Sequence, residues 1–287
     1  MHLILTATPA LAPIFPYIDI GPMNWGGFTI HPFGILVGIA IFTGMYFVQK
    51  RGDQLGLNPA LVAELVTVTV VAIFVGSHLF MVLAYQPERV LEDPLVLVRL
   101  WDGIASFGGL IGLVLTAWYY HLRGKLPFWT SMDVLIWGGL HAWVFGRAGC
   151  SVAHDHPGLF TDSWFSVRWP VNHPDQILNV HGLPGRHDLG LYEFLYTFVL
   201  LGIFYFSHKR WSWRPGFSTG LLFVFYAPAR FGMDFLRAVD KRYFHLTPAQ
   251  YGSLLMFAFG LYLLRRHFMQ KPEAGTPTEP VEDDIPT

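Results

Sequence analysis

The sequence predicts an all-α, polytopic membrane protein with seven transmembrane helices and a small irregular extracytoplasmic lid, the N-terminus outside and the C-terminus inside. Of its 287 residues, 53% are hydrophobic and 14% are charged, and the mean hydropathy is +0.40. Seven largely apolar segments approach the length of about 20 residues that a helix needs to cross a bilayer. The distribution of basic residues then indicates the orientation.

The seven expected transmembrane segments are residues 30–49, 61–85, 104–121, 134–148, 189–207, 216–235 and 251–267. The residues before the first segment lack a basic cluster and include Pro9 and Pro13, so we expect no cleaved signal peptide there. The first transmembrane segment is therefore expected to direct insertion. The segments do not repeat one another, which weakens a transporter interpretation.

Basic residues favour one set of connections over the other. The connections after the first, third, fifth and seventh segments carry Lys50, Arg51, Arg123, Lys125, Lys209, Arg210, Arg214, Arg265, Arg266 and Lys271. The opposite connections carry fewer basic residues, namely Arg89, Arg99, Arg168, Arg186, Lys241 and Arg242. Acidic residues are interleaved with these. By the positive-inside rule the first set is cytoplasmic. This predicts the N-terminus outside and the C-terminus inside.

Two segments are expected to lie outside the bilayer. Residues 150–188 form the long, proline-containing lid, which is too short for an independent core and should pack on the rest of a domain spanning residues 1–269. Residues 270–287 are rich in proline and acidic side chains and have no apolar period, which predicts a disordered cytoplasmic tail.

The composition argues against several ligands. Cys150 is the only cysteine, which excludes an intramolecular disulfide, and its spacing does not suggest a metal cluster. We therefore expect no metal and no cofactor. A net charge of −1 argues against a nucleic-acid partner.

Two arginines lie in or at the end of apolar runs, Arg147 in the fourth segment and Arg230 in the sixth. A charge inside a membrane costs at least about 2.5 to 3.5 kcal/mol on insertion scales, so it usually marks a substrate path or a structural pair. The planar guanidinium fits phosphate bidentately, which favours a phospholipid head group. The structural alternative, equally favoured by this segment alone, is an Arg147–Asp155 pair that closes the fourth helix.

Acidic residues accompany both arginines. Arg230, Asp234 and Arg237 are spaced by four and three residues, which places them on one helical face. Asp234 can neutralise only one arginine, which leaves a positive charge for an anion; the alternative is a helix end that is neutralised internally. Glu193, about a turn inside the fifth segment, is expected either to pair with Arg147 or Arg230 or to bind substrate.

Four segments of the chain resemble prolipoprotein diacylglyceryl transferases. Gly146, Arg147, Gly149, Asp155 and Gly158 match places in the family's hallmark run. Further landmarks occur in the family's order: Trp101-Asp102-Gly103 before Gly108-Gly109-Leu110-Ile111-Gly112, then Leu191-Tyr192-Glu193, then Tyr226 with Arg230-Phe231 and Phe235. The resemblance covers about residues 18–266 and includes a topology of seven spans with the N-terminus outside.

The resemblance implies an enzyme of the bacterial cytoplasmic (inner) membrane. It would transfer the diacylglyceryl group of phosphatidylglycerol to the lipobox cysteine in the signal peptide of a prolipoprotein, the first step of lipoprotein maturation. The residues that it implies for catalysis and substrate binding are Arg147, Arg230, Asp155, Gly108, Gly109, Gly149, Gly158, Glu193, Tyr226 and Asp234. From the residues alone, Gly108 and Gly109 are better explained by close helix packing.

The chain departs from the family at several places. The histidine that commonly precedes the glycine pair is absent before Gly108, Cys150 replaces an asparagine, and Asp155 replaces a glutamate. A thiol base could come instead from His154, His187 or His78, because the pKa of histidine lies near working pH. The alternative is that the arginines alone lower the thiol pKa.

Two other functions stay open at this stage. One is a divergent paralogue that uses another acceptor or lipid, which the missing histidine suggests. The other is a catalytically silent lipid-binding protein, and the presence of both Arg147 and Arg230 argues against it. A transporter is least favoured, because the embedded charges concentrate toward one outer end.

Overall fold

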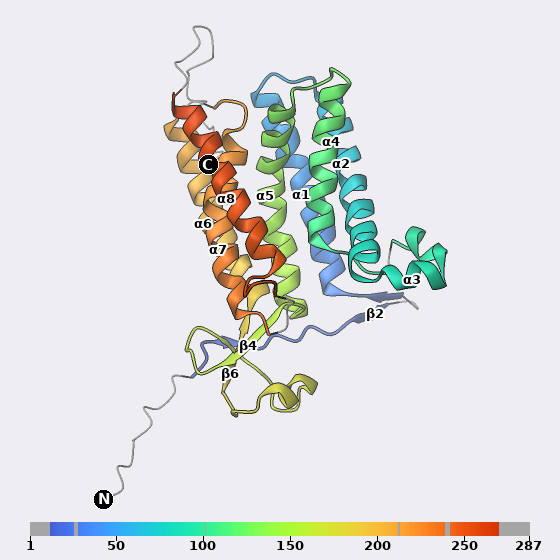
Figure 1. The fold of residues 1–287 in the computed structure, drawn as a ribbon, viewed down its shortest axis with the longest axis vertical. Coiled ribbons are helices and arrows are strands. Elements are labelled where there is room, and N and C mark those ends of the chain that lie inside the picture. Colours follow the sequence, from blue (N-terminus) through green and yellow to red (C-terminus); the bar gives the residue numbers. More distant parts are fainter. Residues whose placement is uncertain (1–11, 26–27, 101, 212, 239–241, 270–287) are drawn as a thin grey trace, which may run out of the picture. The chain divides into compact units, whose positions relative to one another are not determined.

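The computed structural model describes residues 12–25, 28–100, 102–211, 213–238 and 242–269 (Figure 1). The chain divides into two compact units. Unit 1 comprises Met1–Ala40, Trp143–Leu200 and Phe225–Phe257, and unit 2 comprises Ile41–Ala142, Leu201–Val224 and Ala258–Thr287. The predicted disordered tail, residues 270–287, lies outside the described residues.

Within the described ranges, seven long helices cover the seven predicted segments. They are α1 (Pro32–Gln54), α2 (Pro59–Phe80), α4 (Ser106–Leu122), α5 (Phe128–Ala153), α6 (Leu189–Arg210), α7 (Phe217–Met233) and α8 (Pro248–Met269). A π-helical turn, η1 (Met81–Tyr85), extends α2, and a 3-10 turn, η4 (Asp234–Leu236), extends α7. The main error in the predicted bounds concerns α5, which begins before Val134 and continues beyond Ala148.

Three of these helices are long and apolar enough to cross a membrane: α1, α2 with its extension to Ala84, and α6. The helices α4 and α7 have 17 residues each, the lower limit of the roughly 17 to 25 residues of a transmembrane helix. Large hydrophobic side chains stay exposed on several helices, among them Phe42, Leu115, Phe206 and Leu255. Such exposure is expected where lipid is the solvent. The chain is thus a helical membrane protein, and the number of spans and their orientation remain predictions.

In unit 2, glycines bring α2 and α4 into backbone contact. A Cβ atom added at Gly108 would lie 2.1 Å from the carbonyl oxygen of Gly76, and one at Gly112 would lie 2.2 Å from that of Ala72. Neither position can hold a side chain without separating the helices. These contacts explain the glycine-rich entry into α4 as a packing surface of the kind that membrane helices use.

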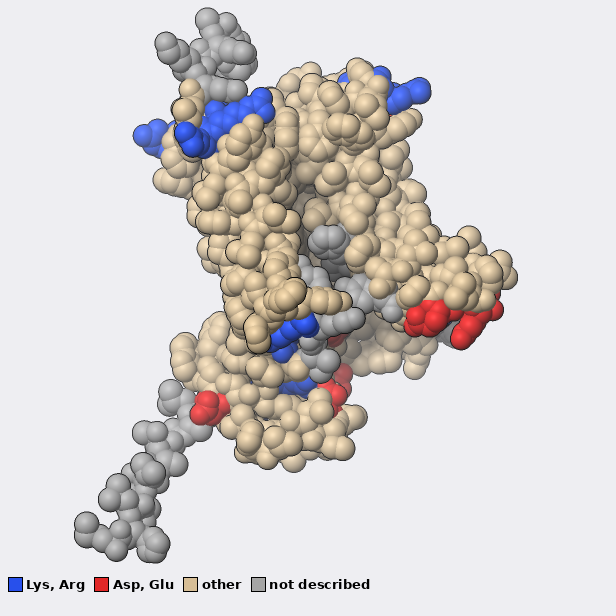
Figure 2. Space-filling model, in the orientation of Figure 1, with Lys and Arg blue, Asp and Glu red and all other residues tan. Residues whose placement is uncertain are grey.

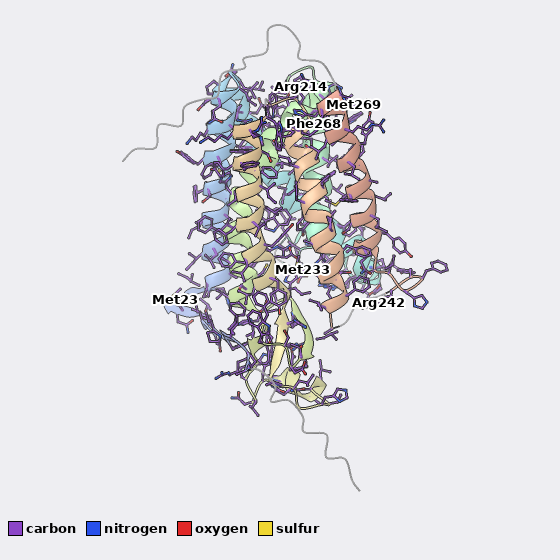
Figure 3. All side chains as sticks on the ribbon, turned by 90° about the vertical axis from the view of Figure 1, so that its left-hand side faces the viewer. Met23, Arg214, Met233, Arg242, Phe268 and Met269 are labelled. Atoms are coloured by element: carbon purple, nitrogen blue, oxygen red, sulfur yellow. The ribbon has the colours of Figure 1, made fainter. Side chains whose placement is uncertain are left out.

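The basic residues of unit 2 gather at helix ends. Figure 2 shows Lys and Arg side chains at the ends of α4, α6 and α8, and Asp and Glu side chains around the short helix α3 (Pro87–Glu92). Arg214 lies beside Phe268 and Met269 (Figure 3), and its Nη1 donates to the carbonyl oxygen of His267 at 3.3 Å. This is the set of connections for which the sequence predicts a cytoplasmic location.

The lid belongs to unit 1, and the prediction that it is irregular is wrong. It contains β4 (Pro157–Thr161), β5 (Val167–Arg168), a 3-10 turn, η3 (Pro174–Leu178), and β6 (Gly185–Asp188). With the N-terminal strand β1 (Phe15–Pro16) these strands form a sheet in the order β1-β5-β6-β4, in which β1 runs parallel to β5. A separate hairpin pairs β2 (Met23–Trp25) with β3 (Phe28–Ile30). The class is therefore mainly helical rather than all-α.

A buried arginine organises the lid. The Arg186 side chain is 2% exposed, and its guanidinium donates to Asp175 Oδ2 at 2.6 Å and to the carbonyl oxygen of Gly158 at 2.8 Å. The same guanidinium lies over the rings of Phe160 and Trp169. A charge that is paired and bonded in this way can be buried at tolerable cost. The lid thus has a small core of its own.

Candidate anion-binding site

One buried carboxylate joins the two arginines that the sequence singles out. In unit 1, Glu193 Oε2 lies 2.7 Å from Arg147 Nη2, and Glu193 Oε1 lies 3.2 Å from Arg230 Nη1. The Glu193 side chain is 2% exposed, whereas those of Arg147 and Arg230 are 12% and 18% exposed. The Tyr226 hydroxyl donates to Glu193 Oε2 at 3.1 Å. Of the two alternatives for Glu193, pairing with an embedded arginine is observed, and it pairs with both; a role in substrate binding stays a prediction.

Local sequence explains how Glu193 reaches Arg147. Gly190 lies one turn earlier on α6, and a Cβ atom added there would lie 2.9 Å from the backbone carbon of Cys150 on α5. The two helices therefore meet backbone to backbone, and the short glutamate side chain spans the remaining gap. The guanidinium of Arg147 also lies 5.6 Å from the ring centroid of Trp143, which packs against Tyr226. These rings hold the arginine in place.

A second carboxylate extends the cluster. Asp234 Oδ1 lies 3.2 Å from Arg230 Nη2 and 3.9 Å from Arg237 Nη1, and the Thr247 hydroxyl donates to Asp234 Oδ2. The predicted common face of Arg230, Asp234 and Arg237 is confirmed. Among the described side chains, the cluster holds three guanidinium groups and two carboxylates. Arg230 thus lies between two buried carboxylates, Glu193 and Asp234.

The alternative prediction, an ion pair between Arg147 and Asp155, is wrong. The carboxylate partner of Arg147 is Glu193, and Asp155 Oδ1 instead lies 2.5 Å from Nδ1 of His156. The reason is the length of α5, which continues to Ala153 and carries Asp155 two turns beyond Arg147. Arg147 Nη1 lies 3.9 Å from Sγ of Cys150, one turn away on the same helix.

The glycines that the sequence suggested for substrate binding lie at close packing contacts. Gly158 forms a β-bridge with Arg237, and an added Cβ atom would lie 2.6 Å from the carbonyl oxygen of Leu236. Gly149 faces the ring of Phe33 on α1. Gly109 belongs to unit 2, where an added Cβ atom would meet Ser77 Oγ at 2.8 Å. These contacts favour the packing interpretation, and a role of Gly108, Gly109, Gly149 or Gly158 in substrate binding stays a prediction.

Two of the three candidate histidines have no ring nitrogen available. His78, in unit 2, places Nδ1 3.0 Å from the carbonyl oxygen of Gly103 and Nε2 2.7 Å from that of Val96. His154 places Nδ1 2.5 Å from Asp188 Oδ2 and Nε2 3.2 Å from the carbonyl oxygen of Ile18. Because every one of these nitrogens faces an oxygen, neither ring offers a lone pair to a substrate. Both histidines connect segments of the fold.

His187 differs from the other two. The Tyr192 hydroxyl donates its one proton to the carbonyl oxygen of Phe165 at 2.5 Å, so Nδ1 of His187, 2.7 Å away, must donate to the Tyr192 oxygen. Burial lowers the pKa of His187 below its ordinary value, which favours the neutral ring. In a neutral ring protonated at Nδ1, Nε2 is an acceptor, and it has no hydrogen-bond partner within the described part of the chain.

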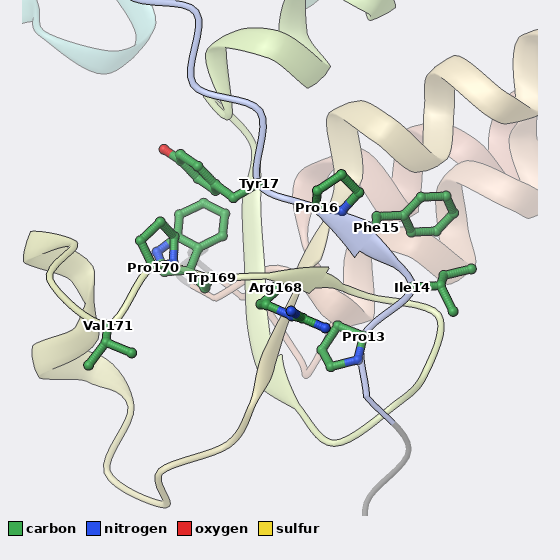
Figure 4. A pocket seen from close by; sticks show the side chains of 9 residues that line it. All are labelled: Pro13, Ile14, Phe15, Pro16, Tyr17, Arg168, Trp169, Pro170 and Val171. Atoms are coloured by element: carbon green, nitrogen blue, oxygen red, sulfur yellow. The ribbon is translucent and has the colours of Figure 1, made fainter.

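A hollow of about 470 Å³ opens on the lid (Figure 4). It is lined by Pro13, Ile14, Phe15, Pro16, Tyr17, Arg168, Trp169, Pro170 and Val171. The rings of Tyr17 and Trp169 meet edge to face, 4.9 Å apart. The hollow contains no residue of the arginine cluster, so the two are separate features of unit 1.

Sequence reasoning missed two residues that support the cluster. Asp188 Oδ1 accepts the backbone N–H of Leu191 at 3.0 Å, which caps the first turn of α6 just before Glu193. Asp188 immediately before an apolar run is the sequence signal for this cap. Thr247, by contrast, is distant in sequence from Asp234, and no local pattern points to their contact.

The fold and the site define a helical membrane protein with a buried, arginine-rich site suited to an anion. A family model described as "Prolipoprotein diacylglyceryl transferase" matches residues 22–266, and the chain belongs to this family. The resemblance noted in the sequence is thereby confirmed.

Curated relatives from several bacteria carry the name phosphatidylglycerol–prolipoprotein diacylglyceryl transferase. The relative from Chromohalobacter salexigens is 31% identical over 79% of this chain and 82% of its own length. The relative from Solidesulfovibrio magneticus is 32% identical over 88% of this chain and 96% of its own. The relative from Coxiella burnetii is 31% identical over 87% of this chain and 95% of its own length.

Proposed function

We propose that the protein transfers the diacylglyceryl group of phosphatidylglycerol to the cysteine thiol of a prolipoprotein. The observation that carries the proposal is the Arg147–Glu193–Arg230 bridge, in which two guanidinium groups share one buried carboxylate. The names of the relatives supply both substrates. The proposed acceptor is the lipobox cysteine of the signal peptide, as the family resemblance implies, and its thiol is the nucleophile.

The reaction is a displacement at carbon. The sulfur of the acceptor cysteine forms a bond to the terminal glycerol carbon of the diacylglyceryl group, the bond from that carbon to the phosphate oxygen breaks, and glycerol phosphate leaves. The thiol proton passes to a base or to the leaving phosphate. Negative charge grows on the phosphate as it leaves, so fixed cations around it lower the barrier.

We assign Arg147 and Arg230 to hold that phosphate. Each guanidinium has five N–H donors, and Glu193 uses only part of this capacity. Glu193 also fixes the two guanidinium groups relative to each other and offsets one charge. A phosphate would then bind across both forks. Asp234 positions Arg230 from the other side.

The thiol proton does not require a histidine base. Cations lower the pKa of a neighbouring thiol to about 3.5 to 7.5, which gives substantial thiolate at neutral pH. His187 is the one candidate among the three whose Nε2 stays open. We assign it an auxiliary role and assign His78 and His154 structural roles. Asp155 is exposed and paired with His156, which leaves its catalytic role without support from the geometry.

The setting follows from the proposed chemistry. We propose a multi-pass protein of the bacterial inner membrane with seven spans, the N-terminus and the lid outside and the C-terminus inside. The basic ends of α4, α6 and α8 support this orientation. Reporter fusions would test it: a cytoplasmic reporter should be active when fused after residue 125, and a periplasmic reporter should be active when fused after residue 182.

The decisive experiment is transfer by purified protein. The full chain in detergent is incubated with phosphatidylglycerol and a lipobox peptide, and the peptide mass is measured. We expect a diacylglyceryl adduct on the cysteine and none on a peptide with serine in its place. Rescue of cells depleted of their own transferase provides the test in vivo. Absence of both results would contradict the proposal.

The missing histidine before Gly108 suggests a second candidate, a divergent enzyme of the same fold, which the names of the relatives do not favour. Such an enzyme would use another lipid or acceptor. The same assay with phosphatidylethanolamine and cardiolipin separates the two, because only the divergent enzyme would prefer another donor. Binding of phosphatidylglycerol without transfer from any donor would indicate a non-catalytic lipid-binding protein.

A further inference from the structure

Three metal-ligating side chains converge at the end of α5. Cys150 lies in the last turn of the helix, and Asp155 and His156 follow the helix end. One ligand atom from each residue lies within 4.8 Å of the other two. His154, between the helix end and Asp155, has a φ of 49°, so the backbone turns sharply at this point. The sequence spacing did not suggest a metal, and the fold brings the ligands together.

We propose that Cys150, Asp155 and His156 form a binding site for a divalent cation of the zinc class. Thiolate, imidazole and carboxylate are the three ligand types that proteins use for Zn²⁺, at about 2.0 to 2.3 Å from the ion. At these bond lengths neighbouring ligand atoms of a tetrahedral site lie roughly 3.3 to 3.8 Å apart. Small changes of side-chain torsion angle, which move these atoms by about 1 Å, would bring them to that spacing. The same changes would separate Asp155 Oδ1 from His156 Nδ1.

The surroundings allow an ion to enter. The Asp155 and His156 side chains are 40% and 24% exposed, so solvent reaches two of the three ligands. Cys150 is partly buried beneath them. A water molecule would complete the tetrahedron, since the described residues supply three ligands within this range.

Charge also favours occupancy. A thiolate and a carboxylate together balance a divalent ion, so the loaded site is neutral. Arg147 Nη1, 3.9 Å from Cys150 Sγ, is a cationic donor toward the sulfur. The charge of Arg147 is itself offset by Glu193 at 2.7 Å. A neutral loaded site therefore adds no net repulsion to the neighbouring arginine.

The test is a titration of the full chain, without a histidine tag, with Co²⁺ in detergent. We expect one Co²⁺ per chain, an absorption band from thiolate-to-cobalt charge transfer, and displacement of cobalt by Zn²⁺ but not by excess Mg²⁺. Cys150→Ser should abolish the band, and Asp155→Asn and His156→Gln should each weaken binding at least about tenfold. His181→Gln, at an exposed lid residue outside the cluster, is the matched control.

The readout does not depend on the transferase reaction, so the two proposals fail separately. Absence of the band, its persistence in Cys150→Ser, or equal weakening by His181→Gln would overturn the metal site. Each variant is first compared with the wild type in thermal unfolding. If Cys150→Ser unfolds, Cys150→Ala and the two single variants at Asp155 and His156 decide the outcome.

Discussion

Glu193 Oε2 accepts from both the guanidinium of Arg147, at 2.7 Å, and the hydroxyl of Tyr226, at 3.1 Å. One buried oxygen thus fixes two donors that stand on different helices. Removing either donor leaves a buried carboxylate that is only partly satisfied, which is costly in an apolar environment. Each substitution in this cluster therefore needs a measurement of folding beside the measurement of activity.

Arg147→Ala and Arg230→Ala should each reduce diacylglyceryl transfer to a lipobox peptide by at least about a hundredfold, because each removes a donor to the leaving phosphate. Arg147→Lys keeps the charge but loses the planar fork, and should recover only part of the rate. Initial rates with phosphatidylglycerol provide the measurement.

Arg168→Ala is the control for both arginines, since Arg168 is an exposed lid residue in another part of unit 1. Wild-type rates in both cluster variants would refute the assignment. Loss of folding without loss of activity per folded molecule would instead favour a purely structural ion pair.

Cys150→Ser should retain most transfer activity in metal-free buffer. Cys150 is the single cysteine and stands where the family commonly has an asparagine, so neither a disulfide nor a covalent intermediate is expected on it. Intact-protein mass spectrometry during turnover checks the point. A diacylglyceryl adduct on Cys150 would indicate a two-step route and contradict this expectation.

His187→Gln should lower transfer by less than about a hundredfold, the low end of what general acid–base catalysis contributes. The reason is that the arginines alone can supply thiolate. Rates for His187→Gln, His154→Gln and His78→Gln across pH 6 to 9 are compared per folded molecule. A collapse confined to His187→Gln and reversed at high pH would identify His187 as the base.

Burial of His187 predicts a pH dependence of stability. Its pKa in the folded protein lies below the ordinary value of 6.5, so the unfolded chain binds more protons between these two values. Stability contributed by the neutral ring is therefore present above pH 6.5 and decreases as the pH falls toward the lowered pKa. Thermal unfolding at pH 7.5 and 5.5 should show a smaller loss in His187→Gln than in wild type. An equal loss in both would contradict the prediction.

Gly158→Ala should destabilise the protein by about 1 to 3 kcal/mol, the usual cost of overpacking. The added Cβ atom would lie 2.6 Å from the carbonyl oxygen of Leu236, and the lid strand would have to move away from Arg237. Gly146→Ala is the control, because no atom lies within 4 Å of its added Cβ. Thermal unfolding in detergent measures both, and an unchanged midpoint in Gly158→Ala would refute the packing role.

Apolar runs predicted the helices well, because a segment surrounded by lipid must satisfy its backbone internally. The start of α5 was missed for a specific reason. The charge of Asp133 lowers the local hydropathy, and the predicted segment starts at the next residue. In the structure Asp133 is buried and accepts the backbone N–H groups of Gly216 at 2.7 Å and Thr219 at 2.9 Å. A charge that caps another helix is invisible to a scan for hydropathy.

The lid shows where local pattern stops being informative. Its strands have two to five residues, too few for a clear alternation. The pairing of Phe15 with Val167 joins residues from opposite halves of the chain. In the site, Arg147, Arg230 and Glu193 were predictable because embedded charges require partners. The Arg147–Asp155 alternative failed because helix length, which sets how far Asp155 lies from Arg147, was underestimated.

The N-terminal cap at Asp188 determines where along the chain an inserted residue would disturb the arginine cluster. Asp188 fixes the start of α6 through Leu191 and holds the lid through His154, and Glu193 follows five residues later. One extra residue between Asp188 and Glu193 would rotate the carboxylate by about 100° around the helix axis, away from both arginines. An extra residue in the exposed stretch near His181 would leave that angle unchanged. Length variation among working relatives should therefore concentrate in the lid and be absent from these five residues.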